Sequence, residues 1–169
     1  MKLYVVRHAH AGDRGAWDGA DRERPLSRKG RRQAEGIAEQ LAGAGIVRLL
    51  SSPSRRCLQT LEPLAERLAL TVEGESRLAE GSWVHDALAL AGELRAEAAA
   101  AGHGAVALCS HGDLIPELLR ALRDRGARID DPLACPKAST WVLGADGDAW
   151  ASCSYLAPPA VGPHKPARH

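Results

Sequence analysis

The feature that most constrains the fold is a set of short apolar runs, each followed by polar residues. Residues 104–109 read GAVALC, a run with no charged position. Such a run is typical of a parallel strand covered on both faces, because a strand with one solvated face alternates apolar and polar residues. Similar runs at residues 3–6 and 46–50 predict two more buried strands. Strands of this kind require helices on both sides of one sheet.

Helical segments separate these strands. Ser27 is well placed to cap the first helix. The apolar stripe of this helix, read at helical spacing, consists of Ala34, Ile37, Ala38, Leu41 and Ala42. A second helix is predicted over residues 58–68, where Pro63 should kink or split it. A third covers residues 88–98, and a fourth follows Asp113, which is expected to cap it.

The last part of the chain predicts a β-hairpin. Residues 139–144 and 149–156 alternate enough to form two strands, and the Asp-Gly-Asp sequence at 146–148 is a turn signal between them. A short strand is also predicted at residues 70–72. From residue 157 onward, Pro, Gly and basic residues predict a flexible tail.

The predicted order of elements is β-α-β-α-β-α-β-α-β-β. This alternation favours the α/β class, as a three-layer α/β/α sandwich with a mostly parallel central sheet. The 169 residues are enough for one domain with a full hydrophobic core. We therefore expect a single domain over residues 1–156 and a flexible C-terminal tail over residues 157–169.

Composition excludes several classes of function. The net charge of +1 predicts no broad basic surface for nucleic acid. No apolar stretch approaches the ~18 residues of a membrane span, and the first residues do not resemble a signal peptide, so we expect a cytoplasmic protein without a membrane partner. The four cysteines are far apart and form no C-x-x-C pair, which argues against a zinc knuckle.

Polar residues follow three of the predicted strands at the point where each strand ends. Arg7 and His8 follow the first strand, SSPSRR (51–56) follows the second, and SHGD (110–113) follows the strand at 104–109. Ligands of parallel α/β sheets bind outside the carboxyl ends of the strands. We therefore expect these three groups to converge at one edge of the sheet.

The residue types at this edge predict an oxyanion site. Arginines such as Arg7 and Arg56 present a planar fork of donors that matches phosphate oxygens. A neutral imidazole such as that of His8 is a competent nucleophile when its other nitrogen is held by an acceptor, and His111 can stabilise charge on the transferred group. Two arginines around two histidines suit a dianion and repel a divalent cation, so no metal is expected.

Five sequence motifs, in this order, resemble a known family. They are RHAHAG, RPLSRKGRRQA, SSPSRRCLQT, RLAEG and CSHGD. The chain is similar to the histidine phosphatase (phosphoglycerate mutase-like) superfamily over residues 2–143. Its short layout resembles the SixA-type phosphohistidine phosphatase branch, and also the histidine phosphatase domain that accompanies some MutT-type Nudix hydrolases. The resemblance implies the phosphoglycerate mutase-like fold.

The resemblance also implies roles for individual residues. His8 is the residue that becomes phosphorylated, and Arg7 clamps the phosphate. The arginine of the SP-x-x-R motif is Arg56, which binds phosphate with Arg7. His111 is the second histidine and contacts the same group.

The resemblance implies roles for two more residues, Arg24 and Glu80. Two other positions, Ala9 and His10, do not follow the motifs of the family. Arg24, in the RPL segment, is a phosphate or substrate contact. Glu80 matches the position of a general acid, and a carboxylic acid there favours ester or anhydride substrates, whose leaving group needs a proton. Ala9 replaces the glycine of the usual R-H-G motif. His10 lies outside the core motif, and its role stays open.

These observations predict a phosphatase that works through a phosphohistidine on His8, without metal or other cofactor. Its substrate is a phosphorylated small molecule, a nucleotide or a phosphohistidine protein. One alternative is a metal-dependent hydrolase that uses the H-x-H spacing of His8 and His10 with Asp13 nearby. The other is a non-catalytic phosphate-binding module on the same fold.

Overall fold

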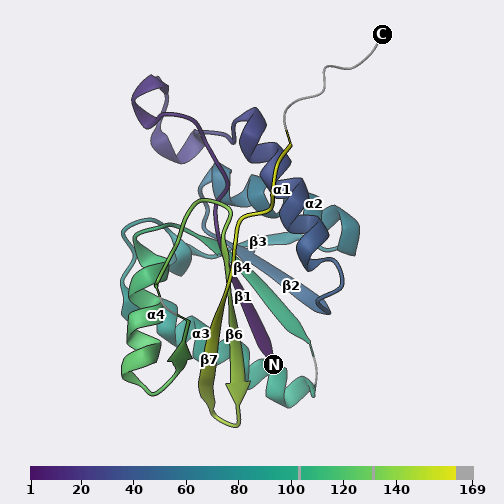
Figure 1. The fold of residues 1–169 in the computed structure, drawn as a ribbon, viewed down its shortest axis with the longest axis vertical. Helices are drawn as coiled ribbons and strands as arrows, with labels where there is room; N and C mark the ends of the chain where they lie inside the picture. The colour runs from purple at the N-terminus through teal and green to yellow at the C-terminus, as the bar shows by residue number, and fades with distance from the viewer. Residues whose placement is uncertain (103, 131, 163–169) are drawn as a thin grey trace.

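The computed structural model of the chain describes residues 1–102, 104–130 and 132–162. Their strands form one seven-stranded sheet in the order β3-β2-β4-β1-β6-β7-β5 (Figure 1). The strands are β1 (Lys2–Arg7), β2 (Ile46–Ser51), β3 (Val72–Gly74), β4 (Ala105–Ser110), β5 (Arg128–Ile129), β6 (Thr140–Asp146) and β7 (Ala149–Leu156).

The sheet is mostly parallel, as predicted. β1, β2, β3 and β4 pair in parallel, and β5 pairs in parallel with β7. Only β6 runs the other way, antiparallel to both β1 and β7. All six residues of β4 are buried, and this strand lies between β2 and β1. The GAVALC run therefore forms a strand inside the sheet, shifted by one residue from the predicted bounds.

Helices cover both faces of the sheet, which confirms the three-layer sandwich. The helices are α1 (Arg28–Leu41), α2 (Arg55–Leu68), α3 (Val84–Ala101) and α4 (Leu114–Asp124), and the short 3-10 turns are η1 (Arg14–Ala16), η2 (Asp21–Glu23) and η3 (Ser76–Leu78). α1 and α2 pack on one face, and α3 and α4 pack on the other (Figure 1). Each face has its own hydrophobic cluster, with Ile37 in one and Trp141 in the other, both fully buried.

The helix signals were correct in part. The Ser27 hydroxyl caps α1 by accepting a hydrogen bond from the Gly30 amide at 3.1 Å. Pro63 does not split the second helix, since α2 runs through it without interruption. Asp113 occupies the N-cap position of α4, but its side chain makes no cap. Its carboxylate instead accepts a hydrogen bond from the Gly81 amide at 2.8 Å, which ties two loops together at the edge of the sheet.

The C-terminal segment passes alongside α1 (Figure 1). Gln40 donates a side-chain hydrogen bond to the carbonyl of Ala157 at 3.4 Å. A Cβ added at Gly36 would lie 2.5 Å from Cβ of Pro159, so this proline packs directly on the helix backbone. The described part of the predicted tail, residues 157–162, therefore has contacts with the domain. The rest of that prediction, residues 163–169, lies outside the described residues.

Two smaller elements differ from expectation. The strand predicted at residues 70–72 lies at Val72–Gly74, and β5 was not predicted because it has only two residues.

No helix in the described ranges is long and apolar enough to cross a bilayer.

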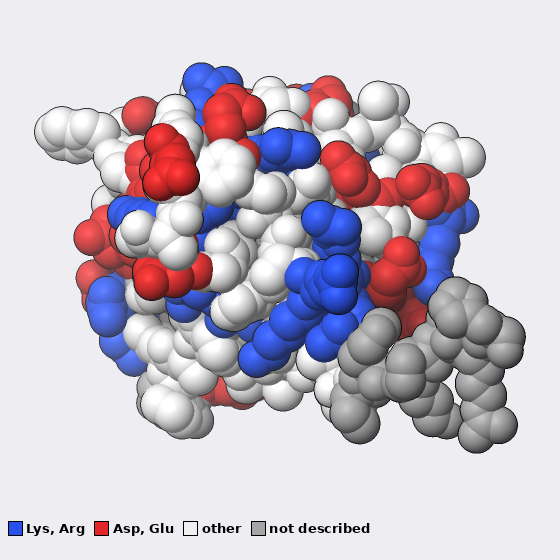
Figure 2. Space-filling model, turned by 90° about the horizontal axis from the view of Figure 1, so that it is seen from above, with Lys and Arg blue, Asp and Glu red and all other residues white. Residues whose placement is uncertain are grey.

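The sheet brings the ends of β1, β2 and β4 to one edge. Arg7 is in register with Ser110, and Ser51 is in register with Cys109, so these strands end side by side. Figure 2 looks onto this end of the molecule and shows Lys and Arg side chains gathered together with acidic side chains around them. The predicted convergence of the three polar groups at one edge is therefore present.

Candidate active site

A pocket of about 330 Å³ opens at the carboxyl edge of the sheet. Five of the six predicted site residues line it: Arg7, His8, Arg24, Glu80 and His111. The sixth, Arg56, lies behind them and is fully buried. Segments that are far apart in the chain thus contribute to one site.

His8 stands at the end of β1 and is held by the main chain. Its amide donates to the Ser110 carbonyl at 3.0 Å, and its ring Nδ1 lies 2.8 Å from the Ala9 carbonyl oxygen. A carbonyl can only accept a hydrogen bond, so Nδ1 carries the proton and Nε2 keeps its lone pair. This arrangement leaves Nε2 unprotonated, with its lone pair available.

The surroundings of His8 keep its ring neutral. The pKa of His8 is lowered from 6.5 to about 3, first because burial disfavours the charged ring and then because His111, Arg56 and Arg7 add positive charge nearby. The hydrogen bond to the Ala9 carbonyl acts in the opposite direction and is outweighed. A neutral imidazole is the form that can attack phosphorus.

His111 faces His8 from the end of β4. The two ring centroids are 5.4 Å apart, and the rings are inclined at 65°. Nε2 of His111 pairs with the Ser52 hydroxyl at 2.8 Å and lies 3.5 Å from the thiol sulfur of Cys57. These contacts hold one side of the ring, and Nδ1 on the other side lies 3.5 Å from Nη2 of Arg56.

Arg56 lies in the first turn of α2, as predicted. Its Nη1 donates to the Asp21 carbonyl at 2.9 Å, and its Nη2 lies 3.2 Å from the Asp21 carboxylate and 3.3 Å from Glu80 Oε2. Arg7 enters the site from β1, and its Nη1 donates to the Cys135 carbonyl. Among the described residues, Nε of both arginines is buried without a hydrogen-bond partner. Buried donors of this kind are suited to an oxyanion.

A glycine makes room for Arg7. A Cβ added at Gly112 would lie 2.6 Å from Cζ of Arg7 and 2.8 Å from its Nε. The guanidinium therefore lies directly against the backbone of the SHGD segment. A larger residue at position 112 would displace the arginine from the pocket.

Arg24 and Glu80 reach the pocket from loops. Arg24 is buried, and it donates to the Asp21 carboxylate at 3.1 Å and to the Ala11 carbonyl at 2.7 Å. Glu80 Oε1 pairs with Nη2 of Arg14 at 2.8 Å at the mouth of the pocket. The predicted substrate contact, Arg24, and the predicted general acid, Glu80, therefore belong to a network of charges around the pocket.

Three residues of this site were not predicted: Arg14, Asp21 and Lys137. Burial opposes the charge of Asp21, but the hydrogen bond from Arg24 and the charges of Arg56 and Arg14 outweigh it and lower the pKa of this carboxyl. Lys137 lines the pocket from the loop before β6. Arg14 and Asp21 begin the short 3-10 turns η1 and η2, and Lys137 lies in a loop. These segments have no periodic pattern, and no sequence signal distinguished the three residues from solvated ones.

Ala9 and His10 each have a structural role. Ala9 is fully buried, its amide donates to the Thr60 hydroxyl at 3.0 Å, and it is not among the residues with positive φ, so the methyl group causes no strain at this position. Nδ1 of His10 pairs with the Ser27 hydroxyl at 2.6 Å, while Nδ1 of His8 faces the Ala9 carbonyl. The two rings of the H-x-H motif therefore have separate partners. In the part of the chain that is described, no three His, Cys, Asp or Glu residues are grouped as metal ligands.

The fold and pocket together define an α/β protein whose site is built for a phosphate-like oxyanion. The model of the histidine phosphatase superfamily (branch 1) matches residues 3–87, half of the chain. The chain belongs to this superfamily.

Relatives and solved structures agree with this assignment. The 8-oxo-(d)GTP phosphatase of Mycolicibacterium smegmatis is 36% identical over 157 residues, which cover 93% of this chain and 48% of that protein. This chain thus spans about half the length of that relative. The protein histidine phosphatase SixA complexed with tungstate has a TM-score of 0.74 at 23% identity, covering 95% of this chain and 97% of SixA. A mycobacterial glucosyl-3-phosphoglycerate phosphatase has a TM-score of 0.63 at 24% identity, covering 92% and 96%. At these identities the two solved structures share the fold.

Proposed function

We propose that this chain is a phosphatase, with residues 1–156 as its catalytic domain and His8 as its nucleophile. The observation that carries the proposal is the neutral His8 ring, with its Nε2 lone pair free, beside the half-buried Arg7 and the fully buried Arg56. Phosphoryl transfer needs mainly positioning and neutralisation of charge. Arg7, His8 and His111, which line the pocket, and Arg56, which lies directly behind them, can supply both, and we call these four residues the inner wall.

In the first step, the lone pair of His8 Nε2 attacks phosphorus. An N–P bond forms as the bond from phosphorus to the leaving oxygen breaks, and the leaving oxygen takes up one proton. Arg7, Arg56 and His111 bind the equatorial oxygens and stabilise the charge that they carry. We assign the proton donor as Glu80 at the mouth of the pocket, which must take up a proton in exchange for its ion pairs with Arg14 and Arg56 before it can act as the acid.

In the second step, water attacks the phosphorus of the phosphohistidine. The new P–O bond replaces the N–P bond, whose electron pair returns to Nε2 of His8. The proton lost by water passes to the Glu80 carboxylate, which restores the acid for the next cycle. The products are inorganic phosphate and the free enzyme, so the cycle consumes only substrate and water.

We propose phosphoric esters or anhydrides of small molecules or nucleotides as the substrate. A leaving oxygen is a poor leaving group without a proton, and a carboxylic acid at the mouth of the pocket addresses that difficulty. The relative that acts on 8-oxo-(d)GTP has an anhydride substrate. The phosphohistidine of a signalling protein is the second candidate, and it has the support of the SixA-like fold.

The test is turnover by the purified chain on an aryl phosphate ester, a set of nucleotides and phosphohistidine peptides, with a strong chelator present. We expect hydrolysis to persist with the chelator. We also expect mass spectrometry to find the phosphoryl group on His8, in digests that are kept out of acid because phosphohistidine hydrolyses there. Loss of activity with the chelator would instead support the metal-dependent hydrolase. Binding of phosphate without any turnover would support the non-catalytic module.

A further inference from the structure

Lys137 is fixed beside the catalytic segment by the main chain of its own loop. The next residue, Ala138, donates its amide to the carbonyls of Arg7 and His8, at 3.2 Å each. Ala138 is buried and has φ of 67°, a left-handed conformation that an L-residue adopts only when its surroundings impose it. The loop therefore holds Lys137 at the pocket at a cost in backbone strain.

Lys137 has cations around it. The pKa of Lys137 is lowered, first because the side chain is partly buried and then because Arg7, Arg24, Arg56 and Arg14 are close. Among the described residues, no carboxylate forms an ion pair with its ammonium group. A half-buried lysine placed among arginines without a counter-ion is unfavourable unless the site binds an anion.

Three other cations of the site differ in this respect. Arg24 and Arg56 pair with Asp21, and Arg14 pairs with Asp21 and Glu80. Among the described residues, Arg7 and Lys137 are thus the two cations of the pocket that pair with no carboxylate. One phosphoryl group on His8 already has Arg7, Arg56 and His111 as partners, so Lys137 is available for a second negative group.

The surroundings of His10 extend this positive region away from His8. The carbonyl of His10 accepts the Ser27 amide at 3.0 Å and lies so close to Gly30 that no side chain fits there. Lys29, between these two residues, is therefore next to His10. The pKa of His10 is lowered, first by burial and then by the charges of Lys137, Lys29 and Arg24. Basic side chains gather at this end of the molecule in Figure 2.

We propose that Lys137, Arg24 and Lys29 form a second anion subsite beside His10, which binds a phosphate bonded to the transferred phosphoryl group. The inference rests on the proposed function and narrows its substrate class. The chain prefers a phosphoanhydride, such as a nucleoside diphosphate or triphosphate or inorganic pyrophosphate, over a simple monoester. Anhydride cleavage still occurs at the phosphorus next to His8, and the second phosphate leaves with the product.

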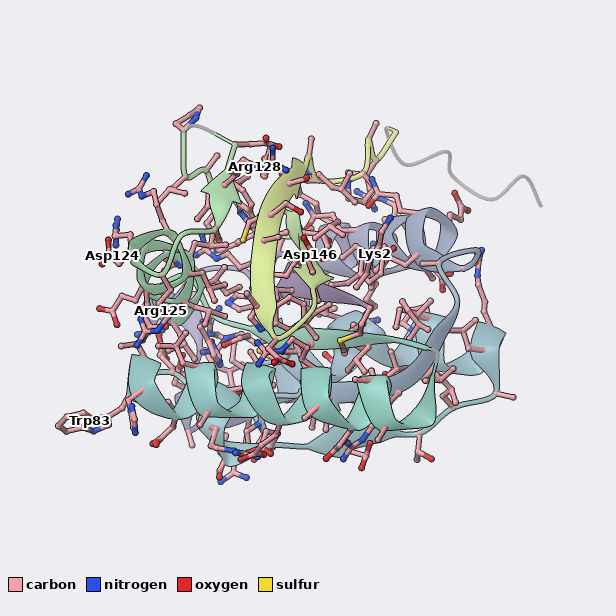
Figure 3. All side chains as sticks on the ribbon, turned by 90° about the horizontal axis from the view of Figure 1, so that it is seen from below. Lys2, Trp83, Asp124, Arg125, Arg128 and Asp146 are labelled. Atoms are coloured by element: carbon pink, nitrogen blue, oxygen red, sulfur yellow. The ribbon has the colours of Figure 1, made fainter. Side chains whose placement is uncertain are left out.

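The kinetic test compares Lys137→Met with the wild type on inorganic pyrophosphate and on p-nitrophenyl phosphate. We expect kcat/KM for pyrophosphate to fall about 10- to 100-fold, the effect of losing one charged hydrogen bond, with less than about threefold change for the monoester. Lys137→Arg should restore most of the loss. The matched control is Lys2→Met, an exposed lysine at the start of β1, labelled in the view from the opposite end in Figure 3. Equal losses on both substrates, or no loss on either, would overturn the proposal.

A binding measurement separates this inference from the proposed function. Isothermal titration compares methylenediphosphonate, which carries two anionic groups, with methylphosphonate, which carries one. We expect the wild type to prefer the diphosphonate and Lys137→Met to lose that preference, whether or not the chain turns over any substrate. If the wild type binds both probes equally, the second subsite does not exist even if His8 is phosphorylated. Thermal unfolding of Lys137→Met and Lys137→Arg shows whether these variants remain folded.

Discussion

The inner wall of the pocket and its rim, which comprises Arg14, Glu80 and Lys137, are built in different ways. Three inner-wall side chains, His8, Arg56 and His111, have at most 5% of their surface exposed. They stand at strand ends or in the first turn of a helix. The rim comes from loops and the short 3-10 turn η1, and the side chains of Arg14 and Glu80 are 60% and 43% exposed. The sheet thus sets the position of the proposed nucleophile, while the rim surrounds the place that we propose for the leaving group.

Burial gives these two regions different electrostatic strength. Charges on the inner wall act in a medium of low polarisability and are not screened by salt, whereas charges on the rim are hydrated. Removing an inner-wall charge should therefore affect the chemical step strongly. A change at the rim should act mainly on substrate choice and should be sensitive to ionic strength.

The largest expected effect is at His8. His8→Asn keeps a similar volume and a hydrogen-bonding side chain but has no nucleophilic nitrogen, so we expect kcat to fall by about 10³-fold or more. Phosphate release under steady-state conditions measures this loss. His85→Asn, an exposed histidine on α3, serves as the matched control and should keep wild-type activity. Comparable activity in the two variants would remove His8 from the mechanism.

The second effect compares an arginine of each region. Arg56→Lys keeps the charge but loses the fork of donors, and it leaves Asp21 and Glu80 with a poorer partner. We expect kcat/KM to fall by about 10²-fold, the usual effect of losing a donor to the transition state. Arg14→Lys at the rim should cost less than about tenfold. A larger effect for Arg14 than for Arg56 would contradict the division between inner wall and rim.

The third effect is at Glu80 and depends on the leaving group. Glu80→Gln cannot donate a proton, so hydrolysis of an alkyl phosphate should fall by about 10²-fold. Hydrolysis of p-nitrophenyl phosphate should fall less in its first step, because p-nitrophenolate leaves without a proton. Rapid-quench measurement of the phosphoenzyme isolates that step. The same loss for both substrates would assign the proton transfer to another group.

The smallest expected effect is on the pH dependence of the free energy of unfolding, and it comes from the buried ring of His8. With a pKa of about 3 in the folded chain against 6.5 when unfolded, His8 binds a proton only in the unfolded state between these values. Its contribution to the free energy of unfolding is therefore fully present above pH 6.5 and is lost as the pH falls toward 3. Urea unfolding of wild type and His8→Asn between pH 7 and pH 4 measures it. The variant should lose less stability on acidification, and parallel curves would mean that His8 titrates normally.

The sequence allowed the prediction of the inner wall because two simple regularities determine it. Apolar runs marked the strands, and the rule that parallel strands end at one edge brought Arg7, His8 and His111 together. These inferences need only local patterns and topology, so the predicted convergence is present even though strand bounds were shifted by about one residue. The choice of Arg56 over its neighbour Arg55 came instead from the resemblance to the SP-x-x-R motif.

The rim was harder to predict because tertiary contacts place it. Lys137 reaches the pocket because Ala138 hydrogen-bonds to the carbonyls of Arg7 and His8, which no local pattern encodes. Asp113 has the residue type of a helix cap, but the Gly81 amide, brought close by the fold, takes its carboxylate. Pro63 removes one backbone hydrogen-bond donor from α2. The helix continues through it because Leu61 and Leu64, on either side of the proline, are both buried.

The proton on Nδ1 of His8 is held by a peptide oxygen, not by another side chain. Genetic change can replace any aspartate or glutamate that orients an imidazole, but it cannot delete a carbonyl. The path of the main chain therefore determines which ring nitrogen is the nucleophile that we propose. Descendants of this protein can lose or exchange their loops, and so acquire new substrates, while the same ring nitrogen remains available.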